Sequence, residues 1–202
     1  CGCGICGAAA VMGVSGQLRA KTDDSVLAVA VVAILGTVFT LIEVALKPYL
    51  GLEAYNYGIF AGSSLHEIAH AVAAGGAGGQ VGLDAAILSK LSRVLMLIVV
   101  AIVLFVINRR SNDEAQGKMP MPYFIIGFVF MSILGSYVSF LKPLAPYFVD
   151  AAYIFLGMAM TALGMSVNFK VIKERGMRVF VACFLSSTIL MIVCYLIAKF
   201  VF

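Results

Sequence analysis

Two histidines and a glutamate close together are the residues of this chain best suited to chemistry. They lie in the stretch GSSLHEIAHAV, where His66, Glu67 and His70 spell H-E-x-x-H. On a continuous helix this spacing brings two imidazoles to one face, where they can bind Zn²⁺ beside a glutamate that acts as general base. The chain has no other histidine. A zinc hydrolase is therefore one interpretation, and Asp84 and Asp150 are the candidates for a third ligand.

The same stretch also suits a path through a membrane. Ionisable side chains inside membrane spans are costly, and they usually face a cavity or each other. On a helix Ser63, His66, Glu67 and His70 would share a polar face, and an imidazole can exchange protons near neutral pH. Three interpretations stay open: a substrate path or proton relay, a buried polar network that only joins helices, and the zinc site. The path would be lined by Ser63, Ser64, His66 and Glu67.

The composition places the chain in a membrane. Of the 202 residues, 62% are hydrophobic and 12% are charged, whereas soluble domains carry about 25% charged residues. The net charge of +4 is small and scattered, which argues against a nucleic-acid surface. The sequence also lacks a Walker A motif, and we expect no cofactor. Cys1, Cys3 and Cys6 have no second cysteine pair to complete a tetrahedral metal site.

Six stretches are long and apolar enough to cross a bilayer, which takes about 20 residues. Lys90 and Arg93 are expected in the first turns of the third stretch, and a shorter glycine-rich stretch, 1–18, precedes all six. We predict an all-α, polytopic membrane helix bundle in which residues 1–202 form a single transmembrane domain. The expected spans are 26–46, 57–74, 88–107, 122–141, 149–167 and 178–202.

Two glycine-broken stretches occupy matching places in the chain. Each leads into a polar stretch and then a long apolar span, and an odd number of crossings separates them. This arrangement is typical of inverted-repeat transporters, whose broken helices present positive N-terminal ends to an anion. Close packing of small residues between helices is the alternative. The residues expected at the two breaks are Cys6, Gly7 and Gly13 in the first stretch and Gly157 and Gly164 in the second.

Four ordered segments resemble one bacterial family. They are ICGAAA (5–10), GIFAGSSLHEIAHAVAAG (58–75), LSR (91–93) and MAMTALG (158–164). Together they are similar to the sulfate exporter family of YeiH-type inner-membrane proteins. Where that family has glutamine, this chain has His70, so one substitution completes the H-E-x-x-H pattern and the zinc interpretation weakens.

The resemblance implies a multi-pass secondary transporter of the bacterial inner membrane, not an enzyme, that exports a small anion such as sulfate. It implies two inverted repeats with broken crossing helices, and it suggests that the chain lacks about the first three spans of a usual member. Coupling to H⁺ or Na⁺ is expected, with Glu67 or His66 as the proton carrier. A homo-oligomer is left open.

Overall fold

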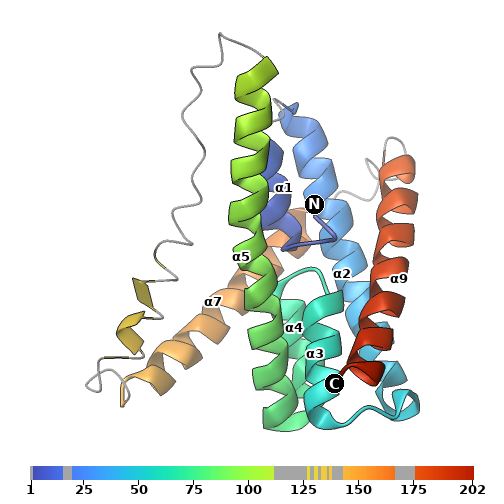
Figure 1. The fold of residues 1–202 in the computed structure, drawn as a ribbon, viewed down its shortest axis with the longest axis vertical. Helices are drawn as coiled ribbons and strands as arrows, with labels where there is room; N and C mark the ends of the chain where they lie inside the picture. The colour runs from blue at the N-terminus through green and yellow to red at the C-terminus, as the bar shows by residue number, and fades with distance from the viewer. Residues whose placement is uncertain are drawn as a thin grey trace.

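The computed structural model describes residues 2–15, 20–111, 143–166 and 176–202, with a few single positions between 127 and 137. All regular structure within these residues is helical, which confirms the predicted all-α class (Figure 1). The helices are α1 (Gly7–Ser15), α2 (Thr22–Leu50), α3 (Ala54–Ser64), α4 (Ile68–Gly76), α5 (Gly79–Ser111), α7 (Ala145–Ser166) and α9 (Met177–Phe200).

Two helices of the described part are long and apolar enough to cross a membrane, namely α2 and α9. The 29 residues of α2 extend for about 43 Å, which exceeds the roughly 30 Å of a bilayer core. Asp23 and Asp24 lie in its first turn and Lys47 in its last, so the charges at both ends interact favourably with the helix dipole. Gly51, with φ +63°, ends the helix in the left-handed conformation. The expected spans 26–46 and 178–202 are thus present as helices.

The expected polar span 57–74 is not one helix, and that prediction was wrong. α3 ends at Ser64, α4 begins at Ile68, and Leu65–Glu67 between them is non-helical, with an extended backbone at Leu65 and Glu67. We call Leu65–Glu67 the α3–α4 break. Two adjacent serine hydroxyls bond back to carbonyls of α3 just before it, a pattern that competes with helix continuation. Lys90 and Arg93 of α5 donate hydrogen bonds to carbonyls at the end of α3, in place of the helical N–H groups that the break removes.

The helix expected over 88–107 begins nine residues earlier than predicted. α5 starts at Gly79, after a two-residue turn at Ala77 and Gly78. Lys90 and Arg93 therefore lie three to four turns inside α5 instead of in its first turns. This shift carries both cations from the expected membrane edge to the level of the α3–α4 break.

The predicted break at Gly157 and Gly164 is contradicted by the structure. α7 runs without interruption from Ala145 to Ser166 and passes through both glycines. A glycine inside a helix costs only about 1 kcal/mol, and nothing in the described residues lies within 4 Å of the position of a Gly157 side chain. The helix therefore continues through both glycines at a small cost in stability. Gly13 likewise lies inside α1, and most of the expected span 122–141 lies outside the described residues.

Glycines bring α3, α4 and α5 into backbone contact. A methyl group at Gly62 of α3 would collide with the Ala86 carbonyl of α5, and one at Gly58 would lie 2.7 Å from the Ala85 side chain. At Gly75 of α4 it would lie 2.5 Å from the Ala86 side chain. These three helices form one tightly packed block, against which α2 and α9 pack through large apolar side chains.

Candidate functional site

The α3–α4 break meets a second interruption of the backbone. Residues Gly2–Cys6 form a turn, which we call the N-terminal turn, and α1 begins directly after it at Gly7. The Ala8 N–H donates to Glu67 Oε1 at 3.3 Å, so the glutamate lies at the amino end of α1. Gly7 has φ +52°, and a methyl group there would lie 2.5 Å from Glu67 Cγ. Only glycine fits this conformation and this contact.

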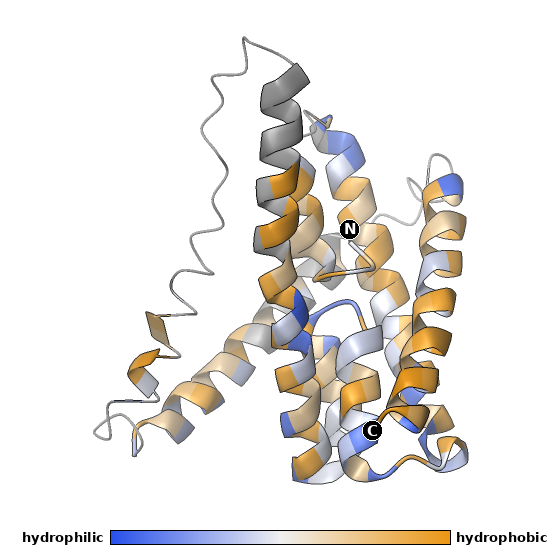
Figure 2. Ribbon diagram, viewed as in Figure 1, coloured by the Kyte–Doolittle hydropathy of each residue, from blue (hydrophilic) through white to orange (hydrophobic). Residues whose placement is uncertain are grey.

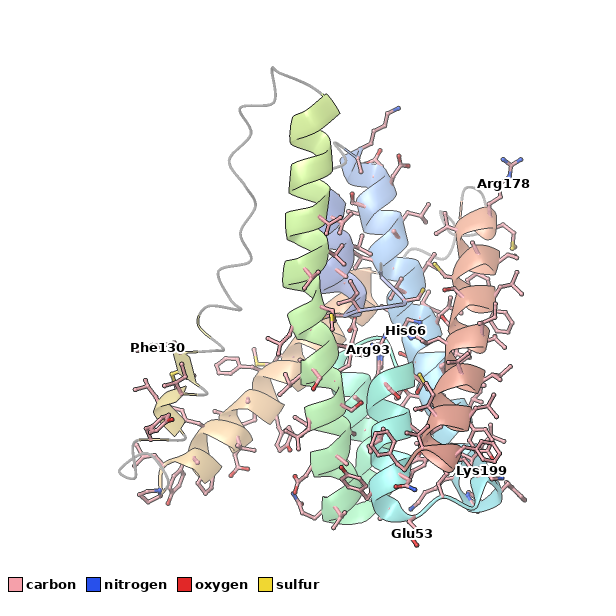
Figure 3. The ribbon with its side chains drawn as sticks, viewed as in Figure 1. Glu53, His66, Arg93, Phe130, Arg178 and Lys199 are labelled. Carbon is pink, nitrogen blue, oxygen red and sulfur yellow. The ribbon has the colours of Figure 1, made fainter. Side chains whose placement is uncertain are left out.

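Arg93 joins the two interruptions. One guanidinium nitrogen donates to the carbonyls of Cys3 (3.2 Å) and Gly4 in the N-terminal turn. The other donates to the carbonyls of Ser63 and Leu65 (3.4 Å) at the end of α3. A single side chain thus satisfies four carbonyls from two segments that lie far apart in the sequence. Figure 3 shows Arg93 and His66 at mid-height of the molecule, well away from Glu53 and Arg178 near its two ends.

Lys90 adds a second cation on the same helix. It is fully buried, and its ammonium donates to the Leu65 carbonyl. The carboxyl end of α3, which carries partial negative charge, therefore meets two cations, while the positive amino ends of α1 and α4 point at the same region. Figure 2 shows hydrophilic residues in the α3–α4 link and on the adjoining part of α5, between helices that are mostly hydrophobic.

The two histidines face different helices. His66 Nε2 lies 2.7 Å from the Ser187 hydroxyl of α9, and that hydroxyl donates to the Cys183 carbonyl at 2.7 Å. His66 must therefore donate from Nε2. His70 Nε2 lies 3.3 Å from the Thr37 hydroxyl of α2, whose proton goes to a carbonyl of its own helix. In both rings Nδ1 is buried and has no hydrogen-bonding partner among the described residues.

These positions remove the geometry on which the zinc interpretation depends. His66 and Glu67 lie in the α3–α4 break, and only His70 lies on a helix, so the motif does not form one helical face. The two imidazoles hydrogen-bond to α9 and α2 respectively. Across the described part of the chain, no three His, Cys, Asp or Glu side chains come close enough together to hold a metal ion.

Comparison with known proteins gives the family. A family model described as "Conserved hypothetical protein 698" matches residues 1–183. The chain is 51% identical to a UPF0324 membrane protein of Lactobacillus johnsonii, with 100% of the chain and 63% of that protein covered. It is 49% identical to UPF0324 membrane protein BL1094 of Bifidobacterium longum, over 94% of the chain and 56% of that protein. The chain belongs to this family.

A third relative, a UPF0324 membrane protein of Bacillus cereus, is 43% identical over 98% of the chain and 59% of its own length. The chain thus spans about three fifths of the length of the curated relatives it matches. No solved structure matches it. Membership establishes a membrane protein, in agreement with the two membrane-length helices, and the names of these relatives state no substrate.

The structure brings some of the predicted site residues of this family member together and separates others. His66 and Glu67 lie in the α3–α4 break, next to Cys6 and Gly7 at the start of α1. Ser63 and Ser64 precede the break, and their hydroxyls donate back into α3, each at 2.6 Å. The remaining predicted residues, Gly13, Gly157 and Gly164, lie inside continuous helices.

Three residues of the site were not predicted from the sequence. Lys90 and Arg93 were assigned to a membrane edge, because the helix that carries them was expected to start later. Ser187 was not noted at all. The available signal was the rule that charged residues inside apolar spans are functional candidates. Applied to 26–46 and 88–107, it selects Lys90 and Arg93 and, outside this site, Glu43 in α2.

Proposed function

We propose that the full-length protein is a secondary transporter, not an enzyme, that moves a small anion across the bacterial cell membrane. The observation that carries this proposal is the meeting of the N-terminal turn with the α3–α4 break inside a membrane protein. Irregular backbone at membrane depth is tolerated only where it is buried in protein or lines a cavity. Discontinuous helices of this kind form the substrate sites of many secondary transporters.

The charges around the break support an anion over a cation. Two helix amino ends, Lys90 and Arg93 are directed toward this region. The carboxylate of Glu67 already occupies the amino end of α1. We propose that this tethered carboxylate holds the place of the transported anion and yields it when the substrate binds. Sulfate is the first candidate, by the resemblance to sulfate exporters, and an H⁺ or Na⁺ gradient would drive the movement.

The test is anion efflux from proteoliposomes that contain the full-length protein. Vesicles loaded with radioactive sulfate, and in parallel with phosphate or chloride, are diluted into buffer with and without a pH or Na⁺ gradient. We expect Glu67→Gln and His66→Ala to lower efflux to the level of protein-free liposomes, because both side chains lie at the break. Glu53→Gln is the matched control, since Glu53 is exposed next to α3.

Two results would overturn the proposal. One is a folded wild-type protein that moves none of the three anions under either gradient. The other is an efflux rate that Glu67→Gln and Glu53→Gln change equally, which would mean that the break does not form the path.

A further inference from the structure

One buried carboxyl group is not explained by the site described so far. Glu43, in the last third of α2, is fully buried. Neither of its carboxyl oxygens has a hydrogen-bonding partner anywhere in the described residues. An ionised carboxylate buried in this way is strongly unfavourable, whereas a neutral carboxyl group is far less costly. Such residues inside spans often belong to proton relays.

Groups from α3 and α9 lie near Glu43. From α3, the Ser64 hydroxyl lies beside the carboxyl group, and the Tyr57 hydroxyl donates to the Glu43 backbone carbonyl at 3.3 Å. From α9, Cys194 is the titratable neighbour. The Ser64 proton is already given to the Phe60 carbonyl at 2.6 Å. Ser64 therefore gives no proton to Glu43, in agreement with the lack of any hydrogen-bond donor to this carboxyl group among the described residues.

Lys90 of α5 is the cation whose charge acts on Glu43. It is also fully buried, and it lies close enough for its charge to act on the carboxyl group. In the present structure its ammonium donates to the Leu65 carbonyl, which is part of the α3–α4 break. Any rearrangement that withdraws this carbonyl frees the ammonium. An ammonium that turns to Glu43 would stabilise the ionised carboxylate, because opposite charges attract strongly where water is scarce.

We propose that Glu43 is a proton-binding site controlled by the α3–α4 break through Lys90. In the state described here the carboxyl group holds a proton, and Lys90 is bonded to the Leu65 carbonyl. When the break rearranges, the O–H bond of Glu43 breaks, its proton passes to water, and Lys90 pairs with the carboxylate. One proton is bound and released in each cycle. This inference rests on the proposed transport function and replaces Glu67 and His66 with Glu43 as the proton carrier.

The first test does not require transport. Dicyclohexylcarbodiimide reacts with protonated carboxyl groups in apolar surroundings, and mass spectrometry locates the adduct on the full-length protein in detergent. We expect an adduct on Glu43 whose yield falls as the pH rises, and none in Glu43→Gln. In Lys90→Met the adduct should persist to higher pH, because the carboxylate loses the cation that stabilises it. An adduct on Glu43 that is missing, or that does not change with pH, would overturn the proposal.

The second test measures coupling in proteoliposomes loaded with radioactive sulfate. In the wild type an imposed pH gradient should change the rate of sulfate flux, and in Glu43→Gln this response should be lost. Glu43→Gln must elute as wild type in gel filtration, and Glu53→Gln is the control with a normal response. A pH response retained in Glu43→Gln would refute coupling at Glu43. A pH-dependent adduct in a protein that moves no anion would instead refute the transport function and leave the proton site standing.

Discussion

At the residue scale, Arg93 replaces hydrogen bonds that two interrupted segments cannot make for themselves. A carbonyl at the end of a helix has lost its partner four residues ahead, and one in a turn has none to begin with. Arg93 donates to two carbonyls of each kind. A guanidinium suits this task better than an ammonium, since it presents five donors in a fixed plane. We therefore assign Arg93 a positioning role for both segments.

Loss of Arg93 should destabilise the protein measurably. In Arg93→Met the Cys3, Gly4, Ser63 and Leu65 carbonyls lose their donor, and we expect a loss of about 3 kcal/mol in the free energy of unfolding. Arg93→Lys should recover part of this loss. The measurement is thermal unfolding of the full-length protein in detergent, followed by circular dichroism. Arg178→Met is the matched control, because Arg178 is exposed at the start of α9. Equal melting temperatures for Arg93→Met and Arg178→Met would contradict the assigned role.

At the element scale, the sequence predicted the helical class and the outer spans but misplaced the breaks. The spans 26–46 and 178–202 are confirmed as helices, because an unbroken apolar run of about 20 residues that crosses a bilayer must satisfy its backbone hydrogen bonds within a helix. Glycine content proved a poor guide to interruption, since α7 continues through Gly157. The break at Leu65–Glu67 depends on Lys90 and Arg93, about 25 residues further along the chain. Such long-range compensation cannot be read from a local pattern.

The continuity of α7 can be tested with one methyl group. Gly157→Ala should stabilise the protein by about 0.5–1 kcal/mol, because alanine favours a helix and no described atom lies within 4 Å of the new side chain. The comparison variant is Gly62→Ala in α3, where the methyl group meets the Ala86 carbonyl and should be destabilising. Melting temperatures in detergent measure both. If Gly157→Ala instead lowers stability and abolishes anion flux, α7 is not the continuous helix described here.

At the scale of the whole molecule, the helices inside the α3–α4–α5 block contact one another differently from the way the block contacts α9. Inside the block, helices touch backbone to backbone at glycines. Between the block and α9, His66 bonds to Ser187, and the N-terminal turn places the Cys3 thiol 3.9 Å from the Cys183 carbonyl. Hydrogen bonds between side chains break and re-form more readily than a glycine-packed interface separates. We expect the working motion to occur between α9 and the block.

A cross-link across this interface should stop transport. The Cys3 thiol lies 3.9 Å from the backbone carbonyl of Cys183. We expect mild oxidation of the full-length protein to join the two cysteines as a disulfide between the N-terminal turn and α9. We expect oxidation to lower sulfate efflux to the level of protein-free liposomes and a thiol reductant to restore it. Cys183→Ser should be insensitive to the oxidant. Unchanged efflux despite a disulfide confirmed by mass spectrometry would mean that this interface does not move.

The glycine contacts also limit what the interruption between α3 and α4 can do mechanically. Both short helices are fastened to the same long helix, α3 through Gly58 and Gly62 and α4 through Gly75. Two short helices packed side by side on one long helix cannot fold toward each other, so Leu65–Glu67 does not act as a hinge between α3 and α4. Any rearrangement is confined to the backbone of these three residues, which can turn the Leu65 carbonyl away from Lys90 while α3 and α4 stay in place. The protein thus keeps in its interior a short polar segment whose hydrogen bonds can change locally without bending the helices on either side of it.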